Sequence, residues 1–116
     1  MPVEANPETF RGLVSGGIVL VAVWGPRCAP CLALMPTVEE TAERHSEHLD
    51  LVTVNAPENR SVCRELGVMG LPTYLVFRDG EETHRLTGDA VTIGDIEQSV
   101  LEAIEQKEEE ANGSEG

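Results

Sequence analysis

The chain has 116 residues, with 21 acidic against 8 basic residues and a formal net charge of −13 at pH 7. Its length fits one domain with its own core. Such an acidic chain lacks the basic footprint of a nucleic-acid-binding protein, and the same charge argues against binding to an anionic membrane. The apolar runs are too short to span a membrane, and no basic segment marks a signal peptide. We therefore expect a cytoplasmic protein.

The first half of the chain predicts a helix, a strand and a second helix. Asn6-Pro7-Glu8 has the pattern of a helix start, with Asn as the N-cap and Pro in the first turn, and this short helix should end at Gly16-Gly17. The continuous apolar run over residues 18–24 favours a strand that is buried on both faces. A long helix is expected over about residues 28–46, bent by the internal Pro36.

The second half predicts an alternating pattern that ends in a helix. A strand, a short helix and two further strands are expected over residues 49–54, 57–66, 73–77 and 83–86. Asp79-Gly80 between the last two strands is a strong hairpin signal, and Thr92 should cap the final helix. The whole order indicates an α/β fold, with a central mixed β-sheet flanked by helices on both faces. We expect residues 1–106 to form the domain and residues 107–116 an acidic, disordered tail.

The motif Cys28-Ala29-Pro30-Cys31 lies where the first long strand gives way to the long helix. Residues three apart on a helical turn share a face at about 5–6 Å, and a disulfide needs Cα atoms about 4.4–6.8 Å apart. The pair can therefore close into a disulfide or open as a dithiol with little backbone movement. Backbone N–H groups at the helix start and the neighbouring Arg27 should hold the pKa of Cys28 below the usual value of about 8.5.

This motif and its surroundings resemble the thioredoxin family over about residues 6–106. The matching positions are Trp24, Cys28-Ala29-Pro30-Cys31, Pro36, Gly70-Leu71-Pro72-Thr73, Asp79-Gly80 and Gly88. The resemblance implies a thioredoxin fold and a protein-disulfide reductase in which Cys28 is the nucleophile and Cys31 the resolving thiol. It further implies a monomer with no cofactor beyond its redox-active disulfide, which acts on protein disulfides and receives electrons from a thioredoxin-reductase-like donor.

The resemblance also implies roles for the neighbours of the cysteines. Pro72 would follow a cis peptide bond and place the Leu71 backbone beside the cysteines, where it can pair with an extended substrate peptide. Thr73 and Gly88 would contact the substrate as well, with the end of a strand as the alternative role for Gly88. Trp24 would pack against the active-site loop, with simple core filling as the alternative. Supporting roles fall to Arg27, Ala29 and Pro30.

The sequence departs from the family pattern at two linked positions. Thioredoxins typically carry a buried Asp six residues before the first cysteine and a Lys near it, and these positions are Ala22 and Thr53 here. The absence of both charged side chains is self-consistent, because a single buried charge without its partner would be costly. We expect slower proton transfer at Cys31 without loss of thiol exchange. Arg27 and Ala29 also replace the usual Trp and Gly.

Two other classes of function stay open at this stage. A redox-weak binding or chaperone module would keep the fold, and Ala22 and Thr53 favour it. A metal-binding thiol module is less consistent with the sequence, because a structural zinc site wants four ligands and only one Cys-x-x-Cys pair exists. The histidines at positions 45, 48 and 84 are expected to be solvated. Cys63 is expected to be a small buried hydrophobe, with a regulatory thiol as the alternative.

Overall fold

The computed structural model describes residues 2–113, with side chains described through Glu110. Its elements are β1 (Val3–Glu4), α1 (Phe10–Leu13), β2 (Ile18–Trp24), α2 (Ala29–Arg44), β3 (Leu49–Asn55), the 3-10 helix η1 (Ala56–Glu58), α3 (Arg60–Leu66), β4 (Thr73–Arg78), β5 (Glu81–Thr87) and α4 (Ile93–Gly113). No helix within residues 2–113 combines the length and the hydrophobicity that a membrane span needs.

The five strands form one mixed sheet in the order β1-β3-β2-β4-β5. The first three of these are parallel to one another, whereas β4 and β5 are antiparallel to their neighbours. Helix α2 makes the crossover from β2 to β3, and the Asp79-Gly80 turn joins β4 to β5. Both turn residues have positive φ, 50° and 89°, as a tight hairpin turn requires. The predicted mixed sheet is confirmed.

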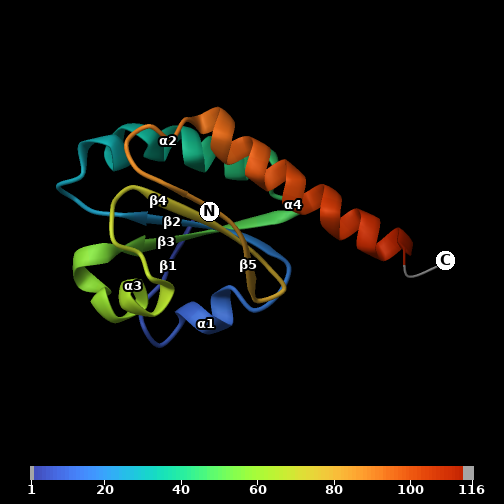
Figure 1. Ribbon diagram of the computed structural model, residues 1–116, viewed down its shortest axis with the longest axis horizontal. Coiled ribbons are helices and arrows are strands. Elements are labelled where there is room, and N and C mark those ends of the chain that lie inside the picture. The colour runs from blue at the N-terminus through green and yellow to red at the C-terminus, as the bar shows by residue number, and fades with distance from the viewer. Residues whose placement is uncertain (1, 114–116) are drawn as a thin grey trace.

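Strand β2 lies at the centre of the core and is buried on both faces (Figure 1). Ile18, Leu20 and Ala22 face α2 and α4, whereas Val19 and Val21 face α1 and α3. Successive side chains of a strand point to opposite faces of the sheet. A strand with an apolar core on each face therefore needs apolar residues at almost every position. The apolar run therefore explains why helices cover both faces of the sheet.

The structure differs from the sequence-based elements in three places. Strand β1 was not predicted, because a two-residue strand is too short to show a periodic pattern. The single helix expected over residues 57–66 is divided into η1 and α3 at Asn59. The regular part of the first helix begins at Phe10, but Asn6 has the capping role that the sequence predicted: its side chain accepts hydrogen bonds from the N–H groups of Glu8 and Thr9 at 2.8 and 3.0 Å, and its carbonyl accepts one from the Phe10 N–H at 3.0 Å.

Helix α4 continues past residue 106, where we expected the domain to end. A reciprocal pair of hydrogen bonds between Thr92 and Asp95 caps its start. The helix reaches Gly113, and ion pairs to the β4–β5 hairpin hold its extension: Lys107 with Asp79 at 2.9 Å and Arg78 with Glu110 at 2.8 Å. Residues 107–113 are therefore helical, and residues 114–116 of the expected tail lie outside the described residues.

Candidate active site

The two cysteines form a disulfide at the start of α2, with their Cα atoms 5.2 Å apart. Cys28 is the N-cap of the helix, in an extended conformation, and Pro30 lies in the first turn. In place of the usual capping oxygen, the Cys28 sulfur accepts a hydrogen bond from the Cys31 N–H at 3.3 Å. The same N–H would stabilise negative charge on Cys28 when the disulfide is open.

The disulfide is unevenly exposed. Cys31 is 1% exposed, whereas Cys28 is partly exposed. The flanking Arg27 and Ala29 are exposed, and Pro30 is partly buried. A macromolecular thiol or disulfide can therefore reach Cys28 but not Cys31.

The segment before β4 lies beside the disulfide. The Leu71–Pro72 peptide bond is cis, as the resemblance implied. Leu71, Cys28 and Arg27 line one hollow together with Gly25, Pro26 and Pro57. The chain therefore brings Leu71, which is 43 positions away in sequence, next to the outer cysteine.

Hydrogen bonds fix this segment to β5. The Thr73 hydroxyl donates to the Gly70 carbonyl at 2.7 Å and lies 2.8 Å from the Thr87 hydroxyl. Gly88 donates its N–H to the Pro72 carbonyl at 2.9 Å and has a φ of 103°, a conformation that favours glycine. Thr73 is 1% exposed, so its side chain holds the loop in place.

Trp24 ends β2 on the other side of α2. It is partly buried and lines a hollow with Leu32, Met35 and Thr53. The indole N–H has no hydrogen-bond partner among the described residues, and neither has the side-chain oxygen of Asn55, its register partner on β3. Trp24 therefore packs beneath the active-site helix with its polar edge unpaired.

Ala22 and Thr53 are direct neighbours across β2 and β3. Ala22 is 0% exposed and belongs to the core under α2 and α4. A charge at either position would thus have its partner at the other, and a charge at the buried position 22 without that partner would be costly.

Sequence reasoning missed a second hollow that adjoins the first through Pro57 and Leu71. Cys63 lies in it, partly buried, and burial raises the pKa of its thiol. This thiol is therefore a weaker nucleophile at neutral pH than an exposed one. The hollow depends on contacts between distant segments, so no local pattern in the sequence could have revealed it.

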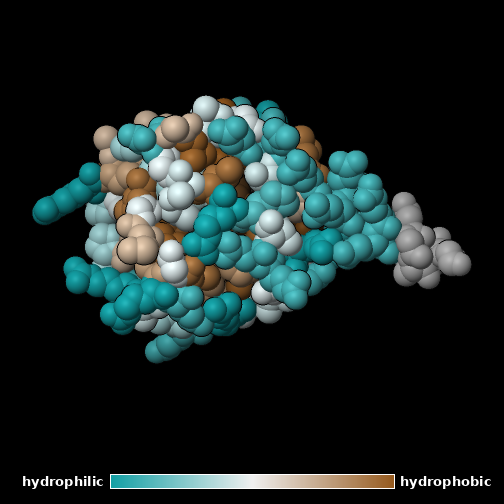
Figure 2. All heavy atoms as spheres, viewed as in Figure 1, coloured by the Kyte–Doolittle hydropathy of each residue, from teal (hydrophilic) through white to brown (hydrophobic). Residues whose placement is uncertain are grey.

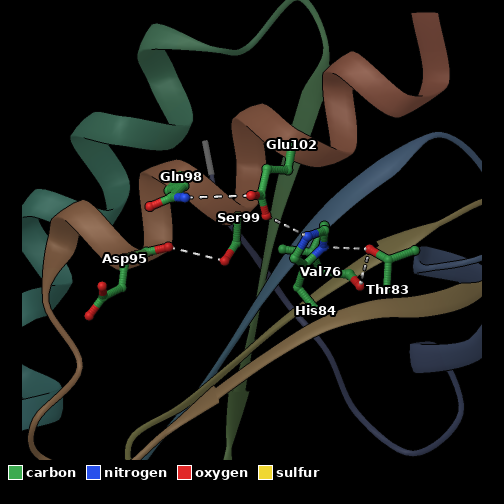
Figure 3. A network of polar contacts seen from close by, with 7 residues as sticks. All are labelled: Val76, Thr83, His84, Asp95, Gln98, Ser99 and Glu102. Atoms are coloured by element: carbon green, nitrogen blue, oxygen red, sulfur yellow. Dashed lines mark hydrogen bonds and ion pairs between the residues drawn. The ribbon is translucent and has the colours of Figure 1, made fainter. Parts of the chain in front are cut away.

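Two of the three histidines are bound to carboxylates of α4 rather than solvated. His45 lies 3.3 Å from Glu97, and the His84 ring lies between Glu102 at 3.1 Å and the Thr83 hydroxyl at 2.9 Å (Figure 3). These contacts hold α4 against α2 and β5. Among the residues that the structure describes, no three His, Cys, Asp or Glu side chains gather as a metal site would require.

Comparisons with known proteins agree with this geometry. The family model described as Thioredoxin matches residues 1–102. A thioredoxin of Bacillus subtilis (strain 168) is 35% identical over 86 residues, which are 74% of this chain and 83% of that protein. A thioredoxin of Acetoanaerobium sticklandii is 31% identical over 103 residues, 87% of this chain and 98% of that protein. The solved structure of a mutant thioredoxin from Halobacterium salinarum NRC-1 has a TM-score of 0.81 at 25% identity, and the match covers 89% of this chain and 90% of that one.

Proposed function

Since the chain belongs to the thioredoxin family and is a thiol-disulfide oxidoreductase, we propose that Cys28 and Cys31 carry its reaction, with Cys28 as the nucleophile. The observation that supports this order is the unequal exposure of the two sulfurs, with Cys31 buried at 1% exposed. A protein disulfide can meet only the outer thiolate.

The reaction proceeds in two exchanges. The Cys28 thiolate attacks one sulfur of the client disulfide, forms a mixed disulfide and releases the other client sulfur as a thiolate, which takes up a proton. Cys31 then loses its proton and attacks the Cys28 sulfur. The mixed disulfide breaks, the second client thiolate leaves and is protonated, and the Cys28–Cys31 disulfide forms. The client gains two electrons and two protons.

The surrounding residues position the client. The Leu71 backbone is free to pair with an extended client segment, and the absence of a side chain at Gly88 leaves room near it. Trp24 supports the start of α2 from below, Arg27 adds positive charge beside the Cys28 sulfur, and Ala29 and Pro30 shape the first turn.

We propose that Ala22 and Thr53 limit the rate at which Cys31 loses its proton. The Ala22 methyl group offers no base under α2, so Cys31 loses its proton to water or to the departing client thiolate. General acid–base help is worth about 10²–10⁴-fold where it is present. We therefore place this protein among slower disulfide reductases that still turn over.

The setting of the reaction is part of the same proposal. The protein acts as a monomer in the cytoplasm, where it reduces protein disulfides. A thioredoxin-reductase-like donor returns two electrons to the Cys28–Cys31 disulfide.

Mixed-disulfide trapping tests the assignment. A peptide whose single cysteine is in a mixed disulfide with 2-nitro-5-thiobenzoate, which diffuses away once displaced, is incubated with reduced Cys31→Ser and Cys28→Ser variants, both made in a Cys63→Ser background, and adducts are located by mass spectrometry. Cys31→Ser should accumulate one peptide per protein on Cys28, because no second thiol can resolve it. Cys28→Ser should accumulate almost none. Equal adducts on both variants would refute the proposed order.

A further inference from the structure

Two hollows adjoin each other beside the disulfide. Their cavity volumes are about 500 and about 450 Å³, and they share Pro57 and Leu71. We call this surface the arginine groove; it is lined by Gly25, Pro26, Arg27, Cys28, Ala56, Pro57, Arg60, Cys63, Arg64, Val68, Met69, Gly70 and Leu71. A client segment bound at Cys28 would lie along it.

The basic residues of the chain divide into two groups. Five of the eight are in ion pairs with carboxylates, namely Arg11, Arg44, Arg78, Arg85 and Lys107. Arg27, Arg60 and Arg64 have no carboxylate partner among the residues whose side chains are described, and all three line the arginine groove. The uncompensated positive charge of this part of the protein thus gathers beside the active cysteine.

The groove also lacks acidic residues of its own. Neither of its two hollows is lined by Asp or Glu. The nearby Glu58 lines a separate hollow with Asn6, and Glu65 pairs with Arg11 at 2.7 Å. By contrast, the hollow between β3 and α2 is lined by Glu39, Glu43 and Asp50. On a chain of net charge −13, the groove is locally positive.

Apolar side chains lie between the arginines. Met69 is 98% exposed, and a flexible thioether adapts to varied partners. In Figure 2, apolar residues lie among hydrophilic ones in the half of the molecule that carries α3 and the β2–α2 loop, whereas the projecting half of α4 is hydrophilic. A groove lined by both apolar and cationic side chains fits an extended peptide better than it fits a purely ionic polymer.

We propose that the arginine groove selects protein clients in which carboxylates flank the disulfide to be reduced. This inference rests on the proposed function and names its substrate class. At physiological ionic strength charges are screened beyond about 8 Å. The acidic end of α4 lies at the opposite end of a molecule 49 Å long (Figure 1), so it hardly opposes an acidic segment that has already docked.

The preference for acidic clients can be estimated from the usual strength of exposed ion pairs. One guanidinium–carboxylate contact at a surface changes an equilibrium by about 1.5- to 5-fold. Three such contacts should raise kcat/KM for an acidic client by about tenfold over a neutral one. The preference should largely disappear in 1 M salt, where the screening length is about 3 Å.

The test uses three peptides that share one internal disulfide loop and carry Glu, Gln or Lys pairs on both sides of it. Their reduction is measured with the wild type, with Arg60→Gln/Arg64→Gln, and with Arg44→Gln/Arg78→Gln, which changes the net charge equally outside the groove. For the wild type and for the Arg44→Gln/Arg78→Gln control, we expect kcat/KM to be about tenfold higher for the Glu peptide than for the Gln peptide. The groove variant should retain only about a two- to threefold preference for the Glu peptide over the Gln peptide.

The outcomes separate the two proposals. If all three peptides are reduced equally, with Cys28 required, the oxidoreductase assignment stands and the acidic-client inference is overturned. That inference is equally overturned if single-stranded DNA or anionic vesicles bind the groove while peptide charge has no effect on reduction. If no peptide is reduced by any form, the proposed function itself is refuted.

Discussion

Replacing Ala22 with Asp should make the stability of this protein depend steeply on pH. Ala22 is 0% exposed within the apolar core, and fully buried carboxyl groups have a pKa raised by about 3–5 units. With a shift of about 3 units from about 3.9, the folded protein holds a proton that the unfolded chain has released. The lost stability then grows with pH, from about 1.5 kcal/mol at pH 5 to about 4 kcal/mol at pH 7. That is a large part of the usual total of about 5–15 kcal/mol.

Urea unfolding at both pH values measures this effect, with Ala22→Asn as the uncharged control of similar shape. Adding Thr53→Lys should restore part of the loss at pH 7, because position 53 is the register neighbour of position 22. Equal losses for Ala22→Asp and Ala22→Asn at pH 5 and pH 7 would refute the reasoning that burial at this site excludes a lone charge.

Three further predictions concern the hairpin and the active-site loop. The hydrogen bond from Lys107 holds the pKa of Asp79 below its usual value. This pairing therefore stabilises the fold at neutral pH, and the stabilisation is lost as the pH falls through the lowered pKa. The Lys107→Met substitution should raise the pKa of Asp79, as measured by NMR titration. Thr73→Val removes hydrogen bonds of 2.7 and 2.8 Å and should cost about 1–3 kcal/mol in urea unfolding. Gly25→Ala would place a Cβ 3.1 Å from the Leu71 side chain and should lower kcat/KM for peptide reduction about 3- to 5-fold, with Cys28 alkylation unchanged.

The parts of the fold predicted from sequence are those with strong local patterns. Strand β2 has the bounds that the sequence predicts, because its apolar run is rich in β-branched residues and shorter than a typical helix, as in a strand buried on both faces. The hairpin turn and the capping role of Thr92 rest on side chains that act within a few residues. The sequence pattern does not indicate the last turns of α4, because ion pairs with the distant residues Arg78 and Asp79 hold them.

The candidate site also combines features that local sequence patterns predict with features that depend on contacts between distant residues. The Cys28–Cys31 pair and its helix start are local features, and the sequence was sufficient to find them. The arginine groove combines residues from three segments, and the unpaired state of its arginines becomes visible only when the partners of the other basic residues are known. Thr73 shows the converse: the sequence does not reveal that its side chain is buried in the sheet, and its contact with a substrate stays a prediction.

The most direct test of the assigned chemistry is the pH dependence of alkylation in the reduced Cys63→Ser protein, with each modified sulfur located by mass spectrometry. Cys28 should react first, with a pKa below the ordinary value of about 8.5, because its sulfur is exposed and receives an N–H at the helix start. Cys31 should stay unmodified until much later, since it is 1% exposed. A Cys28 pKa at or above about 8.5, or earlier reaction of Cys31, would contradict the assignment of Cys28 as the attacking thiolate.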